Sequence, residues 1–137
     1  MATHAVTSQD FNQVVESNDL VFVDFWATWC GPCRAFGPTF EKASEANPDV
    51  YFAKVDIDQN PDLAAAAKVQ AVPTLMVVKK QQIIFQQAGA LRASDLDDLI
   101  SQAKALVFSH LWIWLNSAAI AFCNNAVLFC PLISFSK

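Results

Sequence analysis

The sequence predicts an α/β fold in which a central mixed β-sheet is flanked by helices. Along residues 1–105, apolar strand-like runs alternate with segments whose apolar residues recur at helical spacing. Two further strand-like runs, residues 74–78 and 83–85, are separated by only four residues, which predicts an antiparallel hairpin. Helix-linked strands followed by a hairpin place parallel and antiparallel neighbours in one sheet, so the expected order is α-β-α-β-α-β-β-α.

The first three elements follow from capping residues and apolar runs. A helix is expected after Ser8, which can cap it, because apolar residues then recur at helical spacing. Residues 20–27 contain a single charged residue, Asp24, and such a β-rich run is typical of a strand buried on both faces. A second helix is expected over residues 30–46, with a kink where Pro38 removes a backbone hydrogen bond.

The remaining elements follow in the same way. Residues 50–56 read as a strand, and Asn60 followed by a proline predicts the cap and first turn of a short helix over residues 61–67. The hairpin connection, residues 79–82, has no glycine, so the sequence leaves its turn type open. Ser94 is expected to cap a last helix whose first turn is rich in aspartate.

Composition and charge limit the class of protein. The chain has 137 residues, enough for one domain of ordinary size. Its formal net charge is −4 and no concentrated basic face is visible, which argues against a nucleic-acid partner. The first nine residues hold neither a positively charged start nor an apolar run, so no secretory signal is predicted and we expect a cytoplasmic protein.

The most informative motif is the Cys-x-x-Cys pair formed by Cys30 and Cys33. It follows a buried-type strand and opens a helix, where unpaired backbone N–H groups and the helix dipole stabilise a thiolate. This position favours a redox-active dithiol over a zinc site or two inert thiols. A zinc site would need Cys123 and Cys130, whose spacing is wider than in structural zinc sites, so no metal is expected.

The segment around this pair closely resembles the active-site segment of thioredoxins. Residues 24–33 read Asp-Phe-Trp-Ala-Thr-Trp-Cys-Gly-Pro-Cys, and the similarity covers roughly residues 6–105 in order and spacing. The further matching motifs are Pro38, Lys54-Val55-Asp56, Val72-Pro73-Thr74 and Gly89-Ala90. The resemblance implies a thioredoxin fold and a protein-disulfide reductase that maintains thiol redox balance without a bound cofactor.

The resemblance also implies roles for the residues of the pair. Cys30 would be the nucleophile, exposed at the helix start, which attacks a substrate disulfide and forms a mixed disulfide. Cys33 would be the buried resolving thiol that releases the reduced substrate. Gly31 and Pro32 would fix the tight turn between the sulfurs and hold the couple on the reducing side.

Asp24 is predicted to act as a proton acceptor. A carboxyl group in an apolar strand should have a raised pKa, because burial disfavours its ionised form. Near neutrality such a group can accept the proton of Cys33. The alternative is a satisfied buried acid paired with a lysine, and the resemblance makes Lys54 that partner; the two interpretations are compatible.

The resemblance further implies a docking surface for substrates. Pro73 would follow a cis peptide bond, and the backbone of Val72 would pair with an extended substrate segment as an added strand. Trp29 would form a flat apolar rim beside the nucleophile, and Gly89 would let a neighbouring loop approach this surface. Trp26 is expected to support the core.

Partners follow from the same resemblance. We expect a monomer that acts on protein disulfides and is recharged by a flavoprotein, thioredoxin reductase. The alternative function is a redox-silent thioredoxin-like binding module, membrane-tethered if the tail is an anchor, that holds a partner on the surface of Trp29 and Pro73. The intact cysteine pair and Asp24 argue against this alternative, because a pure binding module needs neither.

Residues 106–137 extend beyond the thioredoxin pattern, which makes residues 1–105 the expected domain. Residues 111–135 carry no formal charge and are long enough for a membrane helix. Internal amides and a late proline weaken that interpretation: Asn116, Asn124, Asn125 and Pro131. A membrane anchor, an accidental extension and a packed extra helix therefore stay open, and the tail cysteines receive no role.

Overall fold

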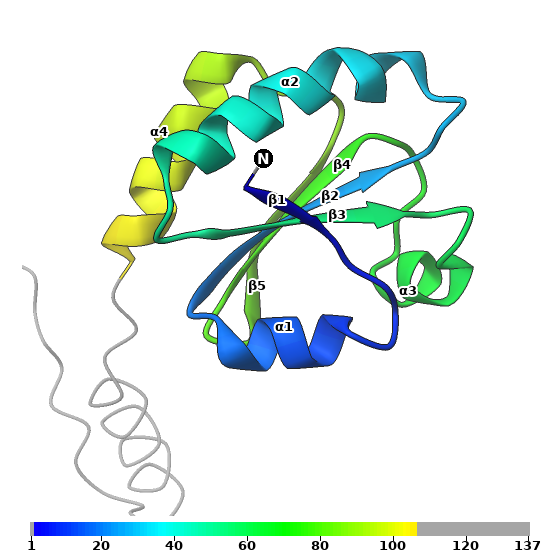
Figure 1. Cartoon of the computed structure of the whole chain (residues 1–137), viewed down its shortest axis with the longest axis horizontal. Coiled ribbons are helices and arrows are strands. Elements are labelled where there is room, and N and C mark those ends of the chain that lie inside the picture. Colours follow the sequence, from blue (N-terminus) through cyan, green and yellow to red (C-terminus); the bar gives the residue numbers. More distant parts are fainter. Residues whose placement is uncertain (1, 107–137) are drawn as a thin grey trace, which may run out of the picture. The chain divides into compact units, whose positions relative to one another are not determined.

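Five strands and four helices make up residues 2–106, the part of the chain that the computed structural model describes (Figure 1). In chain order they are β1 (Thr3–Ala5), α1 (Phe11–Ser17), β2 (Leu20–Trp26), α2 (Gly31–Ala46), β3 (Tyr51–Asp56), α3 (Pro61–Ala66), β4 (Thr74–Lys79), β5 (Gln82–Ala88) and α4 (Ala93–Ala105). Every element predicted from the sequence is present. The structure adds β1, whose three residues are too few to show a period.

The strands form one mixed sheet, as predicted, and the structure gives their order as β1-β3-β2-β4-β5. β3 runs parallel to both β1 and β2, whereas β4 runs antiparallel to β2 and to β5. β2 is therefore the central strand, and its first six residues are buried. Asp24 of β2 lies opposite Lys54 on β3 and Leu75 on β4.

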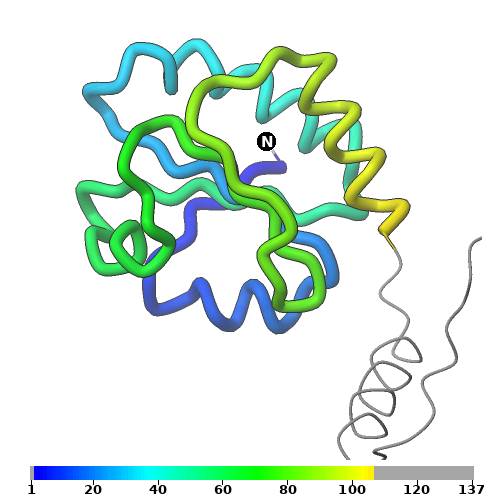
Figure 2. Tube along the Cα trace, turned by 180° about the vertical axis from the view of Figure 1, so that it is seen from behind, coloured from blue at the N-terminus to red at the C-terminus, as the bar shows by residue number. Residues whose placement is uncertain are grey.

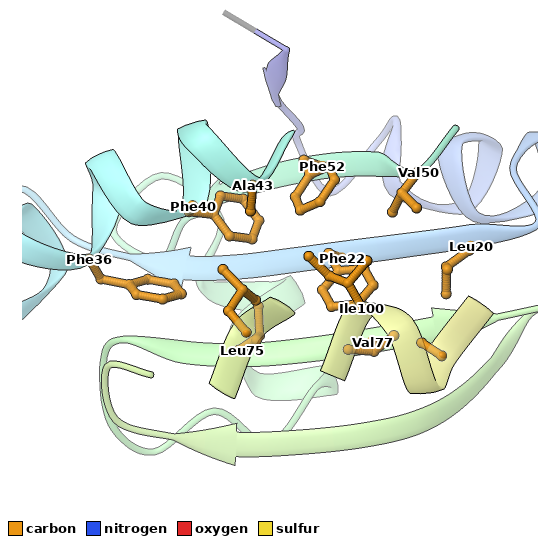
Figure 3. Close-up of a cluster of buried hydrophobic side chains, with 12 residues drawn as sticks. Leu20, Phe22, Phe36, Phe40, Ala43, Val50, Phe52, Leu75, Val77 and Ile100 are labelled. Carbon is orange, nitrogen blue, oxygen red and sulfur yellow. The ribbon is translucent and has the colours of Figure 1, made fainter. Parts of the chain in front are cut away.

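Helices cover both faces of the sheet. α2 and α4 lie on one face, and α1 and α3 lie on the other (Figures 1 and 2). The face under α2 and α4 holds an aromatic cluster, in which Phe40 packs against Phe36 and, edge to face, against Phe52 (Figure 3). Each fully buried side chain of this kind contributes about 1.5–3 kcal/mol, so the cluster is a main source of stability.

α2 is the long helix that carries the cysteine pair. It begins at Gly31 with Cys30 as its cap residue and continues through Pro38 to Ala46. Its buried residues lie on one stripe that faces the sheet: Cys33, Phe36, Gly37, Phe40, Ala43 and Ser44. The second cysteine thus belongs to the same packed face as the core phenylalanines.

The predicted cap of α1 is wrong, because Asp10, not Ser8, is its cap residue. Asn60 is the cap residue of α3 and a proline opens its first turn, as predicted, but the Asn60 side chain makes no capping hydrogen bond. Instead, the Ser8 N–H donates to Asn60 Oδ1 at 2.9 Å, and Asn60 Nδ2 donates to the Asp56 carbonyl at 3.1 Å. The buried amide of Asn60 joins the loop before α1 to the end of β3, and this tertiary contact replaces the local cap.

α4 begins two residues earlier than a cap at Ser94 would place it. Its first residue is Ala93, so Ser94 lies inside the helix and does not cap it. The Leu96 N–H donates to the Arg92 carbonyl at 3.0 Å, and Asp95 is the acidic residue of the first turn. The predicted acidic residue in the first turn is thus confirmed for Asp95, although the helix begins earlier than predicted.

The C-terminal end of α4 is held by a buried lysine. Lys79, the last residue of β4, donates from Nζ to the carbonyls of Ala103 and Lys104. Carbonyls at a helix C-terminus lack intrahelical partners and carry the negative end of the helix dipole. The Lys79 ammonium group supplies both the missing hydrogen-bond donors and a favourable positive charge. Lys104 in turn donates to Asn47 and Asp49 in the loop between α2 and β3.

The β4–β5 hairpin closes through a two-residue turn. Its central residues, Lys80 and Gln81, have φ values of 47° and 65°. Positive φ at both positions characterises the type I′ turn, which asparagine and glycine favour. The sequence left the turn type open, and the structure shows a type I′ turn, which Lys80 and Gln81 adopt at a steric cost because both carry a Cβ.

No helix within residues 2–106 is long and apolar enough to cross a membrane. The predictions about the apolar tail and about Cys123 and Cys130 lie outside the described residues.

The hairpin turn yields a stability prediction. Replacing Lys80 by Asn together with Gln81→Gly should raise the free energy of unfolding by about 1 kcal/mol, because both residues then suit positive φ. Urea denaturation of the double variant and the wild type measures this difference. The control, Gln82→Gly inside β5, should lower stability instead; a double variant no more stable than the wild type would contradict the turn assignment.

Candidate functional site

The cysteine pair lies where β2 gives way to α2, at the edge of the sheet. Cys30 and Cys33 form a disulfide, with Cα atoms 5.3 Å apart. The Cys33 N–H donates to Cys30 Sγ at 3.2 Å, so the sulfur of Cys30 occupies the position of a helix N-cap acceptor. An N–H donor and the positive end of a 16-residue helix dipole both favour a thiolate at this position.

Exposure does not distinguish the two cysteines. Both are 4% exposed, so the expected exposure of Cys30 is wrong for this disulfide form. The bonded sulfurs turn toward each other and pack with Ala27 and with three partly buried side chains: Trp26, Ile57 and Val72. What distinguishes the cysteines is their place on α2, because Cys30 caps the helix and Cys33 lies inside its first turn, on the side that faces the sheet.

Gly31 and Pro32 lie exposed between the cysteines at the start of α2. A Cβ added at Gly31 would meet no heavy atom within 4 Å. The position is therefore open space, and no neighbouring atom requires the absence of a side chain there.

Asp24 is the buried acid of the site. Its side chain lies in the middle of the sheet with 1% of the residue exposed, and neither carboxylate oxygen has a hydrogen-bond partner among the described groups. Burial raises the pKa of Asp24 from 3.8 to about 7, and the positive charge of Lys54 offsets part of that rise. The raised pKa predicted from the apolar strand is confirmed.

Lys54 is adjacent to Asp24 but does not form the expected ion pair. The two residues are register partners on β3 and β2, yet no salt bridge joins their side chains within residues 2–106. Lys54 Nζ lies instead 5.2 Å from the centre of the Trp26 ring, in a cation–π contact. Lys54 is only half-buried, so its ammonium group keeps access to water that an ion pair with Asp24 would remove.

The Val72–Pro73 peptide bond is cis, as the resemblance implies. Val72 packs against the cysteine pair, and the Pro73 carbonyl accepts the Gly89 N–H at 2.8 Å. Gly89 has a φ of +104°, and a Cβ there would meet nothing within 4 Å. Gly89 thus contacts the Val72–Pro73 loop through its backbone, and its positive φ, which side-chain-bearing residues rarely adopt, explains the glycine.

Trp29 is an exposed aromatic residue beside Cys30, as predicted. It is 64% exposed, and its Nε1 donates to Asp58 Oδ2 at 3.0 Å. Asp58 was missed by sequence analysis. The signal that could have found it is its place just after β3, because parallel neighbours such as β2 and β3 end at the same edge of a sheet.

Within residues 2–106, no group of three or more His, Cys, Asp or Glu side chains is placed to hold a metal ion. The second cysteine pair that the zinc alternative requires lies outside the described residues.

Comparison with known sequences gives a family. The thioredoxin family model matches residues 2–102. A relative described as putative thioredoxin 2, from Streptomyces coelicolor, is 50% identical over 105 residues, covering 77% of this chain and 78% of the relative. Thioredoxin C-3 from Corynebacterium nephridii is 39% identical over 98 residues, covering 71% of this chain and 68% of the relative.

Solved structures agree. A thioredoxin variant from Halobacterium salinarum aligns with a TM-score of 0.72 at 35% identity, covering 77% of this chain and 93% of that one. Oxidised mitochondrial thioredoxin 3 from Saccharomyces cerevisiae aligns with a TM-score of 0.68 at 37% identity, and the alignment covers 73% of this chain and 94% of that one. A third structure comes from a study of thiol resolution in yeast mitochondrial 1-Cys peroxiredoxin via glutathione/thioredoxin systems. It aligns with a TM-score of 0.68 at 35% identity, and the alignment covers 74% of this chain and 95% of that one. The chain belongs to the thioredoxin family and is a thiol-disulfide reductase with a redox-active cysteine pair.

Proposed function

We propose that the chain reduces protein disulfides with Cys30 as the nucleophile and Cys33 as the resolving thiol. The observation that carries this order is the hydrogen bond from the Cys33 N–H to Cys30 Sγ at the N-terminus of α2. That donor and the helix dipole lower the thiol pKa of a cysteine at the cap, and the thiolate is the attacking species.

The reaction proceeds through two exchanges. The Cys30 thiolate attacks one sulfur of the substrate disulfide, forms a mixed disulfide and expels the other sulfur as a thiolate. The Cys33 thiolate then attacks Cys30 Sγ, which closes the Cys30–Cys33 disulfide and releases the second substrate thiolate. Two electrons pass to the substrate, and two protons restore its thiols.

Asp24 is assigned the proton of Cys33. The second exchange needs a Cys33 thiolate, and a nearby carboxylate with a pKa of about 7, raised by burial, can take that proton near neutrality. Lys54 acts on this group through its charge, since it lowers the pKa that burial raises. Support for both roles comes from the burial of Asp24 on β2, the strand that leads into the cysteine pair, and from its register with Lys54.

The surface around the disulfide is assigned to substrate binding. An extended substrate segment would pair with the backbone of Val72 as an added strand, between the exposed ring of Trp29 and the Pro73–Gly89 contact. Pro32 and the open space at Gly31 complete this docking surface. Trp26 and Pro38 support it from behind, through the cysteine cluster and through α2.

The proposed partners are protein disulfides and a flavoprotein reductase of the thioredoxin reductase class, which would return two electrons to the Cys30–Cys33 disulfide. The related chain from the peroxiredoxin study supports thiol-containing proteins of that kind as substrates. We place this monomeric reductase in the cytoplasm, where a reducing environment keeps such a dithiol in turnover. The catalytic domain is residues 1–105, the length that the described elements fill.

The order of attack is tested by single cysteine variants. Cys30→Ser should abolish reduction of insulin disulfides, because no attacking thiolate remains. Cys33→Ser should form mixed disulfides that persist, which mass spectrometry of non-reduced samples detects. Trapping by Cys30→Ser in place of Cys33→Ser would reverse the two roles.

The role of Asp24 is tested by Asp24→Asn. Turnover should fall roughly tenfold or more below pH 7 and less above it, because hydroxide increasingly replaces the missing base. Burial raises the folded-state pKa to about 7, so the wild type loses stability as pH rises from about 4 to 7, and Asn should remove that loss. A stabilised variant whose pH–rate profile matches the wild type would leave Asp24 without a role in proton transfer.

The proposed domain is tested by cutting the chain after Ala105. The shortened chain should reduce insulin disulfides, with dithiothreitol as electron donor, at the rate of the full chain. The reason is that each proposed site residue lies within residues 24–89. A folded but inactive fragment, beside an active full chain, would show that residues 106–137 contribute to catalysis.

A further inference from the structure

Three groups share one face of the sheet beneath α2. Asp24 and Trp26 alternate along β2 and therefore point to the same side, and Lys54 lies beside Asp24 on β3. The Lys54 ammonium has two neighbours of opposite kind: a fully buried carboxyl group and the half-buried ring of Trp26. It lies over the ring, 5.2 Å from its centre, and makes no ion pair with the carboxyl group.

The backbone of α2 also approaches the ammonium group. A Cβ added at Gly37 would lie 3.9 Å from Lys54 Nζ, in ordinary van der Waals contact. The backbone of α2 at Gly37 therefore flanks the ammonium group without a close contact that would displace it from the ring. The position over Trp26 is therefore open to Lys54 and lies closer to solvent than Asp24 does.

We propose that Trp26 is a positioning residue that holds the Lys54 ammonium over its ring and so prevents an ion pair between Lys54 and Asp24. The proposal rests on the proton-acceptor role proposed for Asp24 and extends it to a residue that touches neither the proton nor the substrate. An ion-paired Asp24 would stay ionised and hold protons weakly, which suits a proton acceptor for a thiol poorly.

Few other charges act on Asp24. Its neighbour on β4 is Leu75, and Cys33 of α2 is held in the disulfide. The buried residues of α4 are all apolar. The other carboxylate on this face, Asp56, lies opposite Trp26 and accepts the Asp58 N–H. Lys54 is therefore the charge whose position can change the proton affinity of Asp24.

The test is a double-variant cycle on the full-length oxidised protein, read by the carboxyl ¹³C signal of Asp24 during a pH titration. Trp26→Leu should lower the pKa of Asp24 by about one pH unit, because the released ammonium moves onto the carboxylate. Trp26→Phe keeps a weaker aromatic face and should give a smaller fall. In a Lys54→Met background, Trp26→Leu should leave the pKa unchanged.

The control for lost packing is Phe40→Leu, which removes a buried ring from the same face without touching Lys54. Phe40→Leu should lower the melting temperature and leave the pKa of Asp24 unchanged. An unchanged or raised pKa in Trp26→Leu, or an equal fall without Lys54, would overturn the proposal. If Trp26→Leu does not fold, the same readings apply to Trp26→Phe.

This readout does not depend on turnover. A fall in the pKa of Asp24 that requires Lys54 supports the positioning role of Trp26 even if Asp24→Asn retains the wild-type pH–rate profile. Conversely, a changed profile in Asp24→Asn with no effect of Trp26 on the titration would keep the proton-acceptor role and remove the positioning role.

Discussion

The burial of one carboxyl group without a hydrogen-bond partner is the constraint on which the rest of this structure depends. Asp24 can have a pKa near neutrality only if water is excluded from it. That exclusion requires a central strand covered on both faces, and β2 is such a strand. The apolar neighbours that exclude water also supply the stability that the buried acid costs, since the phenylalanine cluster packs on the same face.

The same arrangement places the thiol chemistry on a rigid support. Cys33 shares the buried stripe of α2 with Phe36 and Phe40, so packing of the core fixes the cysteine. Cys30 lies one turn away, at the helix end where backbone N–H groups are unpaired. A single helix therefore joins the fixed thiol to the activated one, and a change in its packing would reach both.

How far the sequence predicts this molecule depends on the range of the interaction. The element order, the mixed sheet and the burial of Asp24 follow from patterns within one segment, and those predictions are confirmed. Ser8 was misassigned as a cap, and the Asn60 side chain does not cap α3, because these two residues bond to each other across 52 positions of sequence, which no local pattern records. The position of Lys54 was missed for a similar reason: register places it beside Asp24, but its contact with Trp26 decides where the ammonium lies.

The contact between Lys79 and the carbonyls at the end of α4 fixes the C-terminal end of this helix beside the last residue of β4. Lys79 is the register partner of Leu20, the first residue of β2, whereas the cysteine pair follows the last residue of that strand. Seven residues of strand separate these points by roughly 20 Å. A fluorophore or a surface linker attached at residue 106 would therefore lie far from the docking surface. This end of α4 is thus a suitable attachment point for immobilising the enzyme while its disulfide stays accessible to substrates.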